Sequence, residues 1–385
     1  MTKLIHQPLG DRHVGIQNIR HRHVDILGRF ARDIGPLLDV HQLIDKVTQY
    51  TSEIFGADVA LLLLHALDSQ TVWTNTHTGP GAWPKRLRFD DDLGLAGYIF
   101  QHLEPVRFSD ACRHYLYSST ACKFLERIAK PVHSVMATPV LNHDVECIAI
   151  LEVADRRANH FSEADLSLLQ HMAVYVGICL ENAQRFDAQK RQFETMIHAV
   201  SNAIDARDAF TQSHSANVAN YAVGIGLLLG LDNRHLQALR LAALLRDIGK
   251  ISTPDRILTK VGRLEAQEFE EVKKHARYTR QILAHIEFAP PYEDTPNLAA
   301  AHHEKLDGSG YPDGLAGTEV PLKARILTVA DIFHTLTQPR HYRLGMPLTK
   351  AISILDDLAP HQLDDRCVIA LKAFVGIGPA PMPAA

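Results

Sequence analysis

The spacing of apolar residues changes along the chain and divides it into two parts. In the N-terminal part, apolar residues recur at helical spacing over residues 40–54. Short apolar runs follow at residues 58–64, 71–76, 134–140 and 147–153. Runs of this length, bounded by turn residues, are typical of buried strands. The N-terminal part is therefore predicted to be an α+β domain built on hairpins.

A long helix is predicted to follow this domain. Ser162 is a typical N-cap residue, and no Pro or Gly interrupts residues 178–209. Apolar residues repeat every seven positions in two rows, the second interrupted by Lys190: Phe186, Phe193 and Val200, and Ala183, Ile197 and Ile204. This spacing predicts a short parallel coiled coil and hence a homodimer. The alternative is a long helix packed only on its own domain, but the coiled coil is favoured because both flanking segments read as complete domains.

In the C-terminal part, the pattern is almost entirely helical, and several ionisable residues fall on apolar helix faces. Arg246 and Asp247 end one apolar stripe, His275 lies within another, and Asp331 and His334 share a third. Ionisable groups inside a helical core cost free energy unless they are paired or bound to metal. Bundles build metal sites from His and acidic residues on separate helices. We therefore expect an all-α bundle with a metal centre.

A pair of adjacent histidines, His302 and His303, ends an Ala-rich segment and directly precedes a Gly-rich turn at residues 307–312. A turn of this composition lets a ligand approach the backbone closely. For the pair alone, a helix C-terminus that carries two surface histidines is the favoured interpretation. The inward-facing residues on the other helices favour a metal site.

Composition narrows the classes of function. The net charge of −4 gives no electrostatic reason to expect nucleic-acid binding. The five cysteines form no C-x-x-C motif and fit reduced thiols. The first residues lack the apolar core of a signal peptide, and the longest apolar runs are too short to span a bilayer. We therefore expect a cytoplasmic protein without a membrane span.

Four stretches of the N-terminal part resemble the GAF domain, a small α+β sensor module of many signalling proteins. They are GLAGYI at 94–99, EPV at 104–106, SVMATP at 134–139 and FSEAD at 161–165. The resemblance implies an antiparallel sheet with flanking helices. GAF domains bind cyclic nucleotides, haem, bilins or other small molecules, or serve only as dimer scaffolds, and no residue here selects among these. Cys112 and His114 lie in the variable loop, where some relatives hold cofactors; a surface loop without a ligand is the favoured alternative.

Five motifs in the C-terminal part resemble the HD-GYP family, a branch of the HD-domain phosphohydrolases that acts on the bacterial second messenger cyclic di-GMP. They are DIGK at 247–250, HHE at 302–304, DGSGYP at 307–312, VAD at 329–331 and RHYR at 340–343. The resemblance implies an HD-type helical bundle. The predicted domains are an N-terminal arm and helix at 1–37, a GAF-like sensor at 38–183, a coiled-coil linker helix at 184–208, the HD-GYP domain at 209–376 and a flexible tail at 377–385.

The resemblance also implies roles for individual residues. The implied metal ligands are His214, Asp247, His275, His302, His303 and Asp331. Asp247 would bridge two metal ions. Fe, Mn, Zn and Ni all suit ligands of this kind. Lys250 would act in catalysis beside Asp247 by countering the phosphoryl charge. The substrate would also contact the loop residues Gly310, Tyr311 and Pro312, and the cations Arg340 and Arg343 would hold its other phosphate.

The chain departs from the family pattern at Arg246, where relatives carry the first ligand, a histidine. A guanidinium has no lone pair and is always charged, so Arg246 cannot bind a metal and would repel one. The sequence therefore predicts one metal, or a weakly bound first metal, with Arg246 pairing with Asp247 or Asp331 or contacting a phosphate. Two lesser departures are Asn217, where relatives usually carry Arg, and His334, where they usually carry Asp.

Two functions follow from this pattern. The first is a GAF-regulated phosphodiesterase that opens cyclic di-GMP to pGpG and then to GMP. The second is a degenerate domain that binds cyclic di-GMP or docks a GGDEF-domain partner with little turnover, which Arg246 favours. The retained histidine pair and loop favour the enzyme, which is the working hypothesis. A hydrolase of another phosphorylated nucleotide is disfavoured by the loop and the arginine pair.

Overall fold

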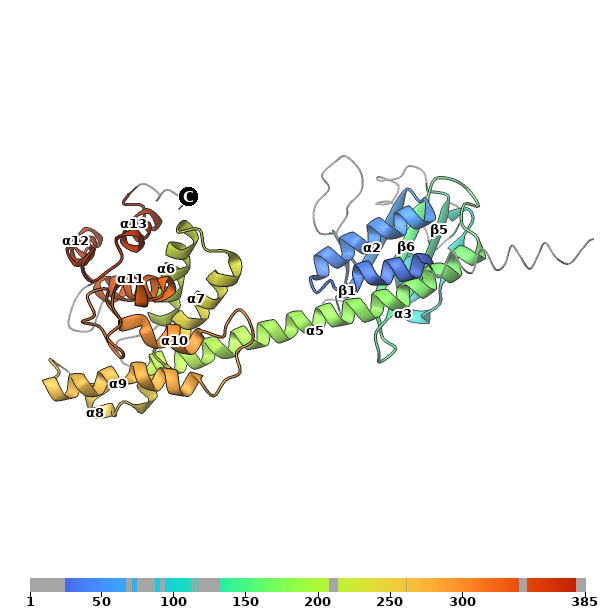
Figure 1. Cartoon of the computed structure of the whole chain (residues 1–385). Coiled ribbons are helices and arrows are strands. Elements are labelled where there is room, and N and C mark those ends of the chain that lie inside the picture. Colours follow the sequence, from blue (N-terminus) through green and yellow to red (C-terminus); the bar gives the residue numbers. More distant parts are fainter. Residues whose placement is uncertain are drawn as a thin grey trace, which may run out of the picture. The chain divides into compact units, whose positions relative to one another are not determined.

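The structure, a computed structural model, describes residues 25–66, 71–74, 87–90, 94–111, 114, 116, 132–207, 214–260, 262–338 and 345–378. The chain forms two compact units, Met1–Arg191 and Gln192–Ala385. Helix α5 (Glu163–Arg207) contains the boundary between them and so belongs to both (Figure 1). Cys112, which the sequence placed in a variable loop, lies outside the described residues.

The first unit is built on a six-stranded antiparallel sheet with the strand order β3-β2-β1-β6-β5-β4. The strands are β1 (Val59–Ala66), β2 (Thr71–Thr74), β3 (Leu87–Asp90), β4 (Val106–Phe108), β5 (Ser134–Leu141) and β6 (Cys147–Asp155). The predicted antiparallel sheet is thus confirmed. Strands β3 and β4 were not predicted, because an alternation over three or four residues is too short to stand out.

Side chains on the central strands alternate between two apolar layers. From β1, Leu62 and Leu64 join the core beneath α2 (Val40–Phe55), α5 and the helical residues 25–34. Leu61 and Leu63 join a second core beneath α3 (Gly94–His102). Helices therefore cover both faces of the sheet (Figure 1). Burial on both faces explains why these strands read as continuous apolar runs.

Helix α5 begins as the sequence predicts and packs closely on the sheet. The Asp165 backbone N–H donates to Ser162 Oγ at 3.2 Å, and Ser162 in turn donates to the Asp165 carboxylate at 2.6 Å, which caps the helix. Gly177 lies against strand β5, where an added Cβ would come within 2.3 Å of the Leu141 carbonyl oxygen. A glycine here permits this close helix–sheet contact.

The second unit is helical in its described residues. Its helices are α6 (His214–Leu228), α7 (Asn233–Leu245), α8 (Asp255–Leu258), α9 (Ala266–Leu283), α10 (Thr295–Ala300), α11 (Leu322–Thr337), α12 (Leu348–Leu358) and α13 (Asp365–Phe374). Short 3-10 turns η4 (Ile248–Ser252), η5 (Ala301–His303) and η6 (Gly317–Glu319) join some of them. The predicted all-α bundle is confirmed. The C-terminal half of helix α7 contributes to its core, with residues 241–245 all buried.

The two predicted coiled-coil rows have different surroundings. Ile197 belongs to the core of the second unit and Ile204 is also buried, so both pack within their own chain. Phe186 and Phe193 of the other row are exposed on α5. The second row therefore does not form a coiled-coil seam, whereas the first row leaves apolar side chains at the surface. None of the described helices is both long enough and apolar enough to cross a membrane.

One carboxylic acid, Glu152, lies inside the apolar layer beneath α3. Its strand β6 pairs it with Leu61 and Ala137, which both belong to that layer, and the residue is 5% exposed. Burial raises the pKa of Glu152 to about 7.

Glu152 makes the stability of the first unit depend on pH. Because its pKa is raised on folding, the folded unit is favoured below the unfolded pKa and loses stability as the pH rises through about 7. We expect a loss on the order of 3 kcal/mol between pH 4.5 and 8, since each pKa unit corresponds to about 1.4 kcal/mol. Thermal unfolding of the full chain across this range should show the loss, and Glu152→Gln should remove it. The exposed-residue control Glu53→Gln should keep it; an equal pH slope in both variants would contradict this assignment.

Candidate metal centre

The two adjacent histidines are held in place by the segment that follows them. Buried Glu304 accepts the backbone N–H groups of Asp313 at 2.7 Å and Leu315 at 3.0 Å, which folds the loop back onto the histidine pair. Thr328 of α11 donates its hydroxyl to the His302 carbonyl at 3.0 Å. The Gly-rich loop therefore acts as a brace for His302 and His303.

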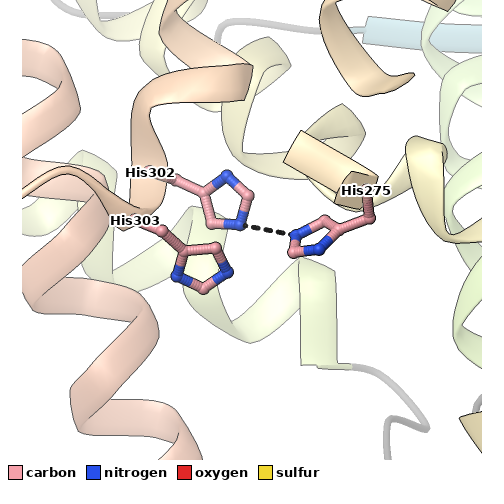
Figure 2. Close-up of side chains that lie close together, drawn as sticks. All are labelled: His275, His302 and His303. Atoms are coloured by element: carbon pink, nitrogen blue, oxygen red, sulfur yellow. Dashed lines mark hydrogen bonds between the residues drawn. The ribbon is translucent and has the colours of Figure 1, made fainter. Parts of the chain in front are cut away.

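His302, His303 and His275 of α9 converge on one point (Figure 2). One nitrogen from each of these rings lies within 4.8 Å of the others. The Nε2 atoms of His275 and His302 are 3.5 Å apart. The two adjacent residues lie at the end of the 3-10 turn η5, and the centroids of their rings lie 5.4 Å and 5.2 Å from that of His275.

Backbone carbonyls fix the proton position on two of these rings. His275 Nδ1 lies 2.6 Å from the Val272 carbonyl oxygen and His302 Nδ1 lies 2.6 Å from that of Ala299. Each Nδ1 therefore carries a proton and donates it, which leaves the Nε2 lone pair directed at the centre. Burial lowers the pKa of all three histidines, that of His302 to about 4, so the rings are neutral at pH 7.

Asp247 brings a carboxylate next to His275 from the end of α7. Its Oδ1 lies 3.6 Å from His275 Nε2 and 3.2 Å from Lys250 Nζ. Burial raises the pKa of Asp247, but Lys250 and Arg246 outweigh it and hold the pKa well below its usual range. Lone pairs from neutral imidazoles and one carboxylate thus face each other, an arrangement that a divalent cation stabilises. The residues present therefore fit a metal ion.

Close packing of α9 against the turn after α7 sets the distance between Asp247 and His275. Thr279 of α9 donates its hydroxyl to the Arg246 carbonyl at 2.8 Å and accepts the Gly249 N–H at 3.0 Å. A Cβ on Gly249 would lie 2.0 Å from the His275 carbonyl oxygen, so only glycine permits this contact.

Arg246 is fully buried, with 0% exposure, and contacts both carboxylates of the site. Its Nη2 lies 3.2 Å from Asp247 Oδ2 and 2.9 Å from Asp331 Oδ1. Its Nη1 donates to the Ala243 carbonyl at 2.8 Å. Of the alternatives that the sequence left open, Arg246 forms ion pairs with Asp247 and Asp331 together.

His214 and Asp331 form the other side of the site. His214 Nε2 lies 3.1 Å from Asp331 Oδ1, and His214 Nδ1 lies 2.6 Å from His334 Nδ1. Burial lowers the pKa of His334 to about 4. The six predicted ligands are therefore close together in two groups: His275, His302, His303 and Asp247 on one side, and His214 and Asp331 with Arg246 on the other.

A pocket of about 480 Å³ opens onto this centre. Its polar lining consists of His214, Asp247, Lys250, Lys260, His275, His303, Tyr311, Asp331, Thr335 and Gln338. Tyr311 is thus the one member of the predicted loop contacts that lines it. Gly310 instead packs against the backbone, where a Cβ would lie 2.5 Å from Glu304 Cα, and Pro312 is not part of the lining. Arg340 and Arg343 lie outside the described residues.

The turn that carries Lys250 is tied to the end of α5. Arg207 donates to the carbonyl oxygens of Lys250 at 2.9 Å, Ile251 at 2.8 Å and Thr253 at 2.9 Å. It also pairs with Asp255 at 2.8 Å. Sequence reasoning did not single out Arg207, Thr279, Thr328 or the bracing role of Glu304, because bonds to distant backbone groups leave no regular spacing.

Comparison with known families matches residues 39–180 to the GAF domain and residues 198–367 to the HD domain. The chain combines a GAF domain with an HD domain. The fold and the family relationships expected from the sequence motifs are therefore confirmed.

Relatives of the chain include several phosphodiesterases. It is 40% identical over 186 residues to 3'3'-cGAMP-specific phosphodiesterase 3 of Vibrio cholerae, covering 48% of this chain and 40% of that protein. It is 35% identical to the cyclic di-GMP phosphodiesterase response regulator RpfG of Xanthomonas campestris, covering 48% of each. It is 33% identical to a cyclic di-GMP phosphodiesterase of Thermotoga maritima, covering 46% of this chain and 49% of that one. The chain spans less than half the length of these relatives.

Replacing Gly249 by alanine tests how closely α9 must approach the turn. The added methyl group would push the His275 and Thr279 backbone away from Asp247. We expect Gly249→Ala to lower the free energy of unfolding of the HD domain by about 1–3 kcal/mol, the usual cost of overpacking. Denaturant unfolding measures this. Gly378→Ala is the control, because its Cβ would meet no atom closer than 3.6 Å, and equal stability of the two variants would contradict the prediction.

Proposed function

We propose that the HD domain is a metal-dependent phosphodiesterase that hydrolyses a 3'3'-linked cyclic dinucleotide. The proposal depends on one observation: three neutral imidazoles cluster beside the Asp247 carboxylate, and His275, His303 and Asp247 of this group line a pocket with Lys250. The names of the relatives support both the reaction and the class of substrate. Cyclic di-GMP is the substrate expected from the sequence, and 3'3'-cGAMP enters as an equal candidate.

Asp247, His275, His302 and His303 would hold the divalent ion, and their nitrogen and oxygen donors suit Fe, Mn, Zn or Ni. Such an ion, when bound, acts as a Lewis acid on a phosphoryl oxygen and lowers the pKa of a bound water. Lys250 lines the pocket with its ammonium group 3.2 Å from Asp247 Oδ1. It would bind the scissile phosphate and neutralise charge that develops there.

The remainder of the pocket suits a nucleobase. Its apolar lining includes Leu264, Phe269 and Val272, and Phe269 is exposed at the surface. An exposed aromatic ring is a stacking platform for a base. Lys260, also in the lining, would attract the second phosphate of a cyclic dinucleotide. The pocket volume falls in the range of about 300–1,000 Å³ that ligand sites occupy.

A second candidate function is ligand binding with little turnover, and Arg246 favours it. A domain of this kind would sense the cyclic dinucleotide or dock a GGDEF-domain cyclase. The pocket would serve either function, because Lys250 and the histidine side of the site are retained. Turnover therefore decides between the two.

The deciding experiment measures hydrolysis by the purified full-length chain. With Mn²⁺ present, we expect cyclic di-GMP or 3'3'-cGAMP to be opened to the linear dinucleotide. His302→Ala should abolish turnover, because it removes one converging nitrogen. Lys250→Met should lower kcat by about 10²–10³, the usual effect of removing one charge-stabilising donor.

The matched control is His285→Ala, an exposed histidine of the same domain, which should keep full activity. Product analysis by chromatography gives the readout for both substrates. If the wild-type chain binds a cyclic dinucleotide tightly without turnover, the phosphodiesterase proposal is wrong and the ligand-binding function takes its place.

We also propose that the chain is a homodimer through α5 and that the GAF domain controls the HD domain. Val174 and Ile178 on α5 are 61% and 55% exposed and line a groove of about 400 Å³ with Leu103 and Pro105. Phe186, further along the same helix, is also exposed. A second copy of α5 is the favoured occupant, because the heptad row of the sequence begins on this helix.

Light scattering after size exclusion tests the dimer. We expect a mass of two chains of 42.9 kDa each for the wild type. The double variant Val174→Glu with Ile178→Glu should elute as one chain, because it places charges in the apolar contact. Gln42→Glu, which adds a charge at an exposed position of α2, should remain dimeric. A monomeric wild type at high concentration would refute the dimer.

A further inference from the structure

We infer that the HD domain holds a single divalent ion and that the guanidinium of Arg246 permanently occupies the place of a second cation, between Asp247 and Asp331. The inference rests on the proposed metal centre and adds to it the number of ions and a role for Arg246. The sequence predicted one metal or a weakly bound first metal, and left open whether Arg246 pairs with Asp247, with Asp331 or with a phosphate. The structure adds what the guanidinium binds in its place.

The contacts of Arg246 are those that a cation would make. Its Nη2 bridges Asp247 Oδ2 and Asp331 Oδ1 at 3.2 Å and 2.9 Å, and its Nε lies 3.1 Å from Asp331 Oδ1. The group is fully buried and is oriented by the Ala243 carbonyl at 2.8 Å. It is absent from the lining of the pocket, so it does not meet a substrate. Arg246 is therefore a positioning residue.

His214, which neighbours Asp331, also has partners within the protein. His214 Nε2 lies 3.1 Å from Asp331 Oδ1, and its Nδ1 lies 2.6 Å from His334 Nδ1. Both ring nitrogens thus have partners within the protein. His275 and His302 differ from His214, because each donates a hydrogen bond from Nδ1–H to a backbone carbonyl. Their Nε2 atoms therefore face the shared centre. The side with His275, His302 and His303 offers lone pairs to an ion, whereas the side with His214 and Asp331 already contains the guanidinium of Arg246.

Charge gives the same result. A divalent ion between Asp247 and Asp331 would lie a few ångströms from the guanidinium, and like charges repel strongly at that distance in a buried site. Arginine remains protonated under all ordinary conditions, so it cannot relieve the repulsion by losing its proton. The guanidinium holds Asp247 through Oδ2 and leaves Oδ1 facing Lys250 and His275. The carboxylate is therefore oriented before any ion binds.

Counting metal ions tests the inference without an activity assay. The full-length chain is loaded with Mn²⁺, desalted and analysed by plasma mass spectrometry and native mass spectrometry. We expect one ion per chain in the wild type and two in Arg246→His, which removes the cation and restores a nitrogen ligand. Arg325→His is the matched control: Arg325 pairs with Asp364 elsewhere in the domain, and this variant should retain one ion.

Electron paramagnetic resonance gives an independent readout. The wild type should show the six-line spectrum of an isolated Mn²⁺, and Arg246→His the spectrum of two coupled ions. If Arg246→His does not fold, as judged by circular dichroism, Arg246→Lys replaces it. That variant keeps the positive charge and should retain one ion.

The outcomes separate the two proposals. Two ions in the wild type, or one ion in folded Arg246→His, would overturn the role of Arg246 and leave the metal-dependent enzyme intact. Two ions in Arg246→Lys would do the same. No ion in the wild type would overturn the metal centre itself, and with it the proposed function.

Discussion

Neutralisation of buried carboxylates is the constraint on which the HD domain depends. Asp247 and Asp331 are both buried, and the pKa of each is held well below its usual range despite that burial. Two ionised acids in an apolar bundle require cations within contact distance. Arg246 and Lys250 supply two of them from one short stretch of chain, the end of α7 and the turn η4. The centre of the bundle is therefore stabilised by groups that the chain itself carries.

The orientations of His275 and His302 also follow from how their buried polar atoms are satisfied. His275 and His302 satisfy one nitrogen with a carbonyl of their own helical segment, three residues earlier. The remaining nitrogens face inward, toward one another and toward the Asp247 carboxylate. This arrangement is stable only if a charged partner lies at the centre, which is why geometry and charge lead to the same interpretation of the site.

Much of this was predictable from sequence, and the reasons differ between residues. His302, His303 and Asp331 are found because they interrupt apolar helical patterns or stand next to a Gly-rich turn. Strands β1, β5 and β6 are found because burial on both faces makes their residues uniformly apolar. Sequence spacing does not reveal Thr279 or Glu304, whose partners are backbone groups distant along the chain or in a loop. The spacing of Ile197 and Ile204 fits a coiled-coil seam and a buried helix face equally well, and only the burial of both residues within the chain distinguishes the two.

Helix α5 ends at Arg207, whose guanidinium holds three successive parts of the turn beside the pocket. The other end of the same helix is embedded in the core of the GAF domain. The turn that carries Lys250 is therefore bonded to the last residue of a helix whose first turns belong to the core of the other unit. One continuous helix thus contributes to both the sheet core and the main-chain bonds beside the pocket.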